Sequence, residues 1–482
     1  MIPRPDSHRL GPCGRFAAPP PVAGSLGPVV ASLVSAAVPL VLAAAPLVLA
    51  AVLLLFAGVA LEAQERPQAF QGAEIITITG ETHPEGTLVV HEGRIVAVGP
   101  TGEVEVPADA EVHDVSGKVI MPGLVDTHSH IGDLDWGTEG PISGAIRILD
   151  VLNVRDAGFP RARAGGITAA NIMPGSGQLM SGQTAYVKLR DGRRVEDLLV
   201  CDDPLTEICG GMKMANGTNP LRPQPPFPQS RAQSAALVRQ RYLQAEEYRD
   251  RIREADGDPD RMPARDLELE AMVEVLDGER IVHHHTPRHD DVITVLRLQE
   301  EFGFRLVLQH VSDAWIVAQE IAESGFPTSL ILVDAPGGKL EAAENHFRSG
   351  AYLEQAGAVV GFHTDDWITD SRYFFRQAGM AVRAGMSREG ALYGLTMAGA
   401  QMMDLEDRIG SLEVGKDADF IVLSGDPLSV YTRVEETWSD GERLFDLSDP
   451  VDRAHAVGGA GLLPRSEQST GRSEAQDGEV GR

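Results

Sequence analysis

A short apolar segment that ends in His-x-His constrains this chain more than any other feature of the sequence. Residues 121–130 form this segment, and its two histidines are His128 and His130. On a β-strand, residues i and i+2 point to the same side, so both imidazoles would lie at one side of the strand tip. They could bind one metal ion together, although an isolated His-x-His is equally compatible with a solvated strand edge. Further candidate ligands elsewhere in the sequence would favour the metal site over the solvated edge.

Three further strand-like runs end in residues that can bind a metal ion. They are residues 279–285, which end at His285, residues 304–310, which end at His310, and residues 358–365, which contain His363 and end at Asp365. Each is a short apolar run that suits a buried parallel strand, and each is followed by a helical pattern. Strand, ligand and helix repeated along a chain predict an α/β fold, a (β/α)₈ barrel of the TIM type. In such a barrel the site lies at the carboxyl ends of the strands.

Several motifs together resemble those of one family. They are residues 117–130, Gly165-Gly-Ile-Thr168, Gly211-Met-Lys-Met-Ala215, the strands ending at His285 and His310, His363-Thr-Asp365 and residues 408–419. The chain thereby resembles the metal-dependent amidohydrolases of the imidazolonepropionase-like branch, from about residue 73 to about residue 446. The resemblance implies a hydrolase that cleaves amide or cyclic amide C–N bonds of small molecules, other than ordinary peptide bonds.

The resemblance also implies roles for individual residues. His128, His130, His285, His310 and Asp365 would bind the metal. Asp365 and His310 would be catalytic, with Asp365 accepting the proton of the attacking water and passing it to the leaving nitrogen.

The neighbouring histidines leave two assignments to settle. Three consecutive histidines blur the register of their strand, and His285 is preferred as the ligand over His283 and His284. His363 is expected to orient Asp365 or the substrate.

Lys213 decides how many ions the site holds. The resemblance implies a carboxylated lysine at this position, which would bridge two ions, whereas a plain lysine would leave one. Imidazoles and a carboxylate suit Zn²⁺, and Mn²⁺ or Fe²⁺ are alternatives. The sequence leaves both the number and the identity of the ions open.

The first 63 residues read as an export signal. A basic start is followed by a stretch without charge from Arg15 to Glu62 and by small residues at its end. The apolar run is long enough to cross a bilayer, so an uncleaved membrane anchor is the alternative. We therefore expect an exported protein, periplasmic or secreted.

The net charge bears on the class of binding partner, and the cysteines bear on whether the chain contains a disulfide. The formal net charge of −28 argues against a nucleic-acid partner and is most simply a solubility feature. A small-molecule substrate is expected, and a homo-oligomer is compatible with the sequence. Cys201 and Cys209 could form a disulfide or stay two buried thiols.

Composition divides the remaining chain. Alternating segments in residues 64–121 predict a small β-sandwich, and the resemblance implies that residues 401–450 complete it. The barrel would span residues 122–400, interrupted by a Pro-rich insertion at 219–228 and a charged helix from 234 to about 255. Residues 175–183 look like a flexible loop near the barrel mouth. Residues 451–482 look like a disordered tail.

The sequence contains little information about the identity of the substrate. Arg288 and Arg372 could clamp a substrate carboxylate, or they could be ordinary surface arginines. The alternatives to an amide hydrolase are a heterocycle deaminase and a non-catalytic metal-binding relative. Because none of the expected ligands is missing, the catalytic alternatives are favoured.

Overall fold

The computed structural model describes residues 66–132, 134, 140–332, 340–366 and 368–458. The expected leader, residues 1–63, lies outside the described residues, and so does most of the expected tail. The described residues belong to one compact unit, which begins at Arg66. In the described part of the chain, no helix is both long and apolar enough to cross a membrane.

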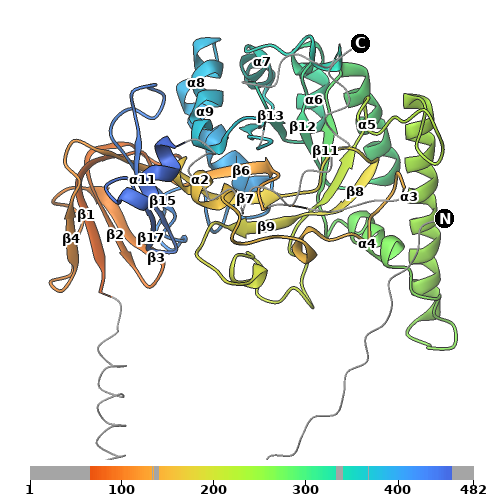
Figure 1. Cartoon of the computed structure of the whole chain (residues 1–482), viewed down its shortest axis with the longest axis horizontal. Coiled ribbons are helices and arrows are strands. Elements are labelled where there is room, and N and C mark those ends of the chain that lie inside the picture. The colour runs from red at the N-terminus through yellow and green to blue at the C-terminus, as the bar shows by residue number, and fades with distance from the viewer. Residues whose placement is uncertain (1–65, 133, 135–139, 333–339, 367, 459–482) are drawn as a thin grey trace, which may run out of the picture. The chain divides into compact units, whose positions relative to one another are not determined.

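An eight-stranded sheet joins the two ends of this unit (Figure 1). Its strands are β1 (Gln68–Ile75), β2 (His83–His91), β3 (Arg94–Pro100), β4 (Glu111–Asp114), β5 (Val119–Pro122), β15 (Phe420–Leu423), β16 (Val434–Ser439) and β17 (Glu442–Asp446). Their order is β17-β16-β15-β5-β1-β2-β3, with β4 beside β1. The antiparallel pair of β5 and β15 brings the amino- and carboxyl-terminal strands together. Phe70, Phe420 and Trp438 pack their rings on one face of this sheet.

The expected sandwich is therefore only partly matched. The described strands form one sheet, so an arrangement of two facing sheets is not confirmed. The first strand starts at Gln68, inside the range 64–121 in which alternating strands were expected. An Asp440-Gly441 turn lies between β16 and β17, and both residues have positive φ.

Two further sheets carry the expected metal-binding residues. One has the order β14-β13-β12-β11-β10-β8 and the other the order β6-β7-β9. Their strands are β6 (Leu124–Ser129), β7 (Ile167–Ile172), β8 (Met180–Gln183), β9 (Ala185–Lys188), β10 (Met212–Ala215), β11 (Val282–Thr286), β12 (Leu306–His310), β13 (Thr328–Leu330) and β14 (Val360–Phe362). Neighbours from β10 to β14 are parallel, as are β6 and β7. A bridge between Ser129 and Asp366 connects the end of β6 to the segment after β14.

A closed barrel of eight parallel strands is not present among the described residues. Strands β8 and β9 run antiparallel to their neighbours β10 and β7. Part of the segment 175–183, expected to be a flexible loop, is strand β8, which pairs with the Lys213 strand. Met180 and Ser181 of β8 are fully buried, and this pairing is a tertiary contact that local sequence does not encode.

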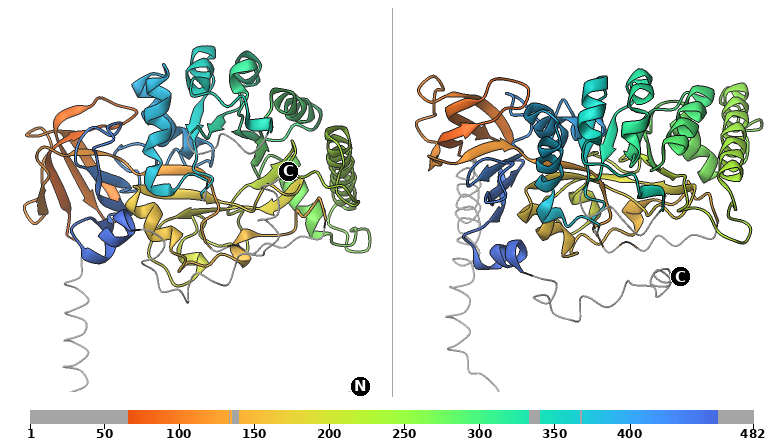
Figure 2. Two further views of the ribbon diagram at one scale, coloured as in Figure 1. Left: turned by 45° about the horizontal axis from the view of Figure 1, so that its top comes forward. Right: turned by 90° about the horizontal axis from the view of Figure 1, so that it is seen from above.

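Helices accompany the parallel strands. Figure 1 shows α5, α6, α7 and α8 near β11, β12 and β13, and the right view of Figure 2 shows the helices of this part of the chain side by side. The α-helices are α2 (Gly158–Ala164), α3 (Arg231–Ala255), α4 (Leu267–Leu276), α5 (His289–Phe302), α6 (Ala318–Ser324), α7 (Ser349–Ala356), α8 (Phe375–Arg383), α9 (Arg388–Leu395), α10 (Met397–Gln401) and α11 (Pro450–Val457). Short 3₁₀ turns are η1 (Ile148–Asp150), η2 (Val195–Asp197), η3 (Ala314–Ile316), η4 (Leu340–Ala342) and η5 (Ser371–Tyr373). The predicted charged helix is α3.

Helix α11 corrects the expected start of the tail. Residues 451–457 were expected to be disordered, but they continue a helix that begins at Pro450. Asp449 accepts hydrogen bonds from the N–H groups of Val451 and Asp452, and a proline suits the first helical position. The helix contacts α2 and β17, and α2 lies far away in sequence.

The two cysteines are joined, which settles the choice that the sequence left open. Cys201 and Cys209 form a disulfide that closes a short loop before β10.

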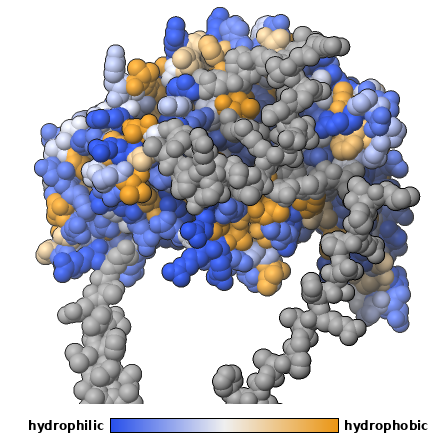
Figure 3. Space-filling view, viewed as in Figure 1, coloured by the Kyte–Doolittle hydropathy of each residue, from blue (hydrophilic) through white to orange (hydrophobic). Residues whose placement is uncertain are grey.

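On the face shown in Figure 3, hydrophilic residues cover much of the described surface, and hydrophobic residues form small patches between them.

Candidate metal centre

The carboxyl ends of several strands place the expected ligands at one edge. In the register of the parallel sheet, Ala215 of β10 pairs with His285 of β11, and Thr286 pairs with His310 of β12. The bridge between Ser129 and Asp366 brings the end of β6 to the segment after β14. Because parallel strands end at the same edge, residues nearly 240 positions apart in sequence become neighbours.

The His-x-His pair converges on Asp365. Nε2 of His130 lies 2.9 Å from Oδ1 of Asp365, and Nε2 of His128 lies 3.4 Å from the same oxygen. Nδ1 of His130 donates to the carbonyl of Met173 at 2.8 Å, which directs Nε2 toward the aspartate. The three residues therefore offer two imidazole nitrogens and one carboxylate oxygen to a common point.

A second group of ligand atoms adjoins the first through His128. It consists of His128, His310 and His363. Nε2 of His363 lies 3.3 Å from Nδ1 of His310, and Nδ1 of His363 lies 2.8 Å from the hydroxyl of Ser329. His363, which was expected to orient Asp365 or the substrate, thus holds the ring of His310.

The structure separates the three consecutive histidines. The ring of His285 lies 4.2 Å from the ring of His310, centroid to centroid. His283 instead bonds the hydroxyl of Tyr186 at 2.8 Å and the amide of Gln309 at 3.2 Å. His284 faces a pocket lined by α3 and α5 on the other side of β11. Of the three, His285 is the one directed toward the histidine cluster, as the sequence favoured.

Lys213 lies directly beside the first histidine. Its Nζ is 2.8 Å from Nε2 of His128 and 3.1 Å from Sδ of Met173, and the side chain is fully buried. Burial lowers the pKa of the Lys213 ammonium to about 7. Gly211 lets β10 approach β11, because a Cβ there would lie 2.4 Å from Cδ2 of His283.

The electrostatics of the cluster suit metal ligands. Burial, followed by the neighbouring Lys213 charge, lowers the pKa of His128 well below its usual value, and burial lowers the pKa of His363 to about 3. Burial alone would raise the pKa of Asp365, but its hydrogen bond with His130 and the nearby charges hold the pKa below its usual value. Neutral imidazoles and an ionised carboxylate are the forms that bind divalent ions, so this donor set fits one.

Two candidate ligand residues have unusual backbone conformations. His310 has φ of 70° and Asp365 has φ of 48°. Left-handed conformations are uncommon outside glycine and cluster at functional sites, where surrounding contacts hold them. For Asp365 one such contact is its N–H, which donates to the carbonyl of His128 at 2.9 Å.

Asp126 is a supporting residue that the sequence analysis missed. Its Oδ1 accepts from the N–H groups of His128 at 3.2 Å and Thr364 at 3.1 Å. Burial raises the pKa of this carboxyl to about 7. It fastens the segment that carries His128 to the segment that carries Asp365. The sequence feature that could have identified Asp126 is its position two residues before His128, which places it on the same side of the strand.

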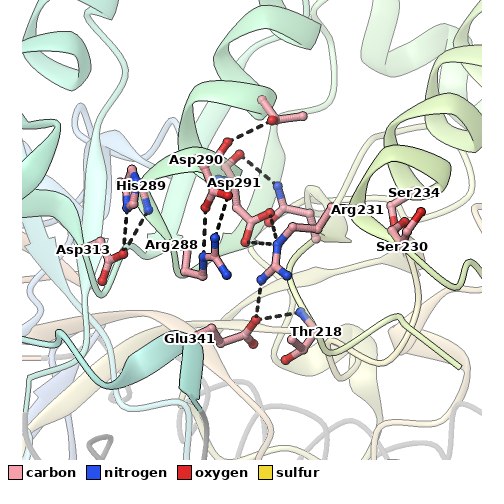
Figure 4. Close-up of polar contacts among 12 residues, drawn as sticks. Thr218, Ser230, Arg231, Ser234, Arg288, His289, Asp290, Asp291, Asp313 and Glu341 are labelled. Carbon is pink, nitrogen blue, oxygen red and sulfur yellow. Dashed lines mark hydrogen bonds and ion pairs between the residues drawn. The ribbon is translucent and has the colours of Figure 1, made fainter.

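Both arginines that were considered as carboxylate clamps are already paired. Arg288 forms two hydrogen bonds with Asp290, at 2.9 and 2.7 Å, and Arg372 forms two with Asp370, at 2.9 and 2.6 Å. Figure 4 shows the Arg288 pair beside a second cluster, in which Arg231 lies between Asp291 and Glu341. The carboxylate clamp is therefore not supported at either arginine.

Comparisons with known proteins bear on the family of this chain. The model of the amidohydrolase family matches residues 216–445. The chain is 27% identical over 402 residues to amidohydrolase tasK of Hapsidospora irregularis, a match that covers 77% of this chain and spans 41% of that relative's length. It is 26% identical over 376 residues to an imidazolonepropionase of Symbiobacterium thermophilum, covering 71% of this chain and 84% of the relative.

A solved structure gives a further likeness. The crystal structure of an amidohydrolase from Thermotoga maritima MSB8 superposes with a TM-score of 0.72 at 32% identity, covering 78% of this chain and 99% of that one. This likeness implies a TIM-barrel-type fold. The prediction from the motifs is thus confirmed, and the chain belongs to the metal-dependent amidohydrolase superfamily.

Proposed function

We propose that this chain hydrolyses an amide or cyclic amide C–N bond of a small molecule at the cluster of His128, His130 and Asp365. The observation that carries the proposal is the convergence of these three side chains, with Lys213 and His310 beside them. Zn²⁺ is the preferred ion for such a donor set. We also propose that the two sheets are parts of a (β/α)₈ barrel and that the protein is exported.

We infer the following roles for the residues of the cluster. A divalent ion held by the cluster would lower the pKa of a water molecule and polarise the substrate carbonyl. Asp365 would accept the proton of the attacking water on its carboxylate and deliver it to the leaving nitrogen. His310, whose ring is held by His363, would bind the metal and orient the substrate carbonyl. His285 would complete the ligand set from β11.

Metal removal tests the proposal directly. We expect purified protein to contain a divalent ion by elemental analysis and to lose activity after chelation, with recovery when Zn²⁺ is restored. Activity is measured on a panel of N-acyl amino acids, dipeptides and cyclic amides, with free amine or carboxylate as the readout. Release of ammonia from heterocycles alone would favour the deaminase alternative. Bound metal without turnover of any of these compounds would favour the non-catalytic alternative.

Lys213 gives a separate prediction about the number of ions. We expect its amine to carry CO₂, so that protein equilibrated with ¹³C-bicarbonate shows a carbamate signal by NMR that Lys213→Met lacks. The same variant should bind one ion where the parent binds two, because a thioether-bearing side chain cannot bridge them. An unchanged stoichiometry and no carbamate signal in the parent would show that Lys213 acts as a plain amine beside His128.

A further inference from the structure

A groove of about 600 Å³ lies away from the histidine cluster, between α8, the connection from β15 to β16, and α11. None of the residues of the candidate metal centre lines it. Its walls include the apolar side chains of Met380, Leu423, Leu428, Val434 and Leu447. Val430 stands at the groove with 87% of its surface exposed. A concave apolar site of this size falls in the range that holds small organic ligands.

The charged residues of the groove are all of one sign. Its lining contains Arg372, Arg376, Arg383 and Arg433 and no aspartate or glutamate, although the whole chain has a net charge of −28. Arg372 is paired with Asp370. Within the described residues, neither the Arg383 nor the Arg433 side chain takes part in a hydrogen bond or ion pair, and both residues are exposed.

Some surface arginines elsewhere in the molecule are paired. Arg239 and Arg305, for example, are each paired with an acidic side chain from a different element. In a chain with so many carboxylates, unpaired arginines along an apolar groove mark a place from which acidic side chains are absent. Charge complementarity there favours an anion with an apolar body.

We propose that this groove binds an amphipathic carboxylate, such as the anion of a medium-chain fatty acid. The apolar chain would lie against Met380, Leu428 and the neighbouring aliphatic residues, and the carboxylate would pair with Arg383 and Arg433. Burial of the chain supplies binding free energy, while the arginines select an anionic head group over a neutral one. This site is independent of the proposed hydrolytic activity.

Titration calorimetry with decanoate on the full chain tests this site. We expect decanoate to bind more tightly than decanol, which lacks the charge, and acetate, which lacks the apolar chain, to give no signal. The double variant Arg383→Ala/Arg433→Ala should weaken decanoate binding by at least about tenfold, because it removes both charge-assisted partners. The matched control is Arg239→Ala on α3, which should bind decanoate like the parent.

A second variant tests the apolar wall without changing the arginines. A Cβ at Gly379 would have only the carbonyl of Leu428 near it, at 3.6 Å, so a larger side chain can enter the groove. We expect Gly379→Phe to abolish decanoate binding while far-ultraviolet circular dichroism stays unchanged.

Equal affinity of the parent and the double arginine variant would overturn the proposal. Binding that appears only after removal of residues 459–482 would also overturn it, because the carboxyl-terminal segment would then be the occupant.

Discussion

Asp365→Asn is expected to lower turnover by roughly 10²- to 10⁴-fold with the fold intact, since loss of a general acid–base group typically has this effect. Asn keeps the shape of the side chain but cannot accept the proton of the attacking water. In the structure, Oδ1 of Asp365 lies within 3.4 Å of both histidines of the His-x-His pair. Steady-state kinetics with metal content measured on the same sample would separate lost proton transfer from lost metal.

Asp366→Asn is the matched control, because this residue is the adjacent carboxylate. Its Oδ2 accepts from the N–H of Ser371 at 3.0 Å, and Oδ1 lies 3.7 Å from Arg161. The side chain therefore faces a turn and not the histidines, and we expect its change to leave turnover close to that of the parent. Near-normal turnover in Asp365→Asn with metal bound would refute the assigned base.

Replacing His128, His130 or His310 with Ala should remove most of the bound metal and nearly all activity. Even groups that only orient a ligand typically change metal affinity by roughly 10- to 100-fold, so loss of a ligand should cost at least that much. These side chains lie at strand ends, outside the main hydrophobic core, so thermal unfolding should remain cooperative. Elemental analysis of each purified variant provides the measurement.

His284→Ala serves as the control for this series. His284 lies on the same strand as His285, but it faces the pocket between α3 and α5. We expect full metal occupancy in this variant. An unchanged metal content in His128→Ala would show that the site is elsewhere.

The sequence alone determined the family and the positions of the candidate ligands. Alternation along a strand predicted that His128 and His130 share one side, and apolar runs predicted β11, β12 and β14. The family resemblance favoured His285 among the three histidines, and in the structure its ring lies beside that of His310. Strand alternation and the length of an apolar run are local features, because they depend only on residues that are close together in the sequence.

Only the tertiary structure decided which partners these residues meet. The pairing of Cys201 with Cys209, the insertion of β8 beside Lys213, and the tie from Asp126 to Thr364 join segments whose distance no local pattern specifies. The sequence likewise could not show which carboxylate Arg288 and Arg372 would bind, because a guanidinium pairs with whichever carboxylate the fold brings close to it. Side-chain chemistry is a property of the sequence, whereas proximity and burial arise when distant strands and helices pack together.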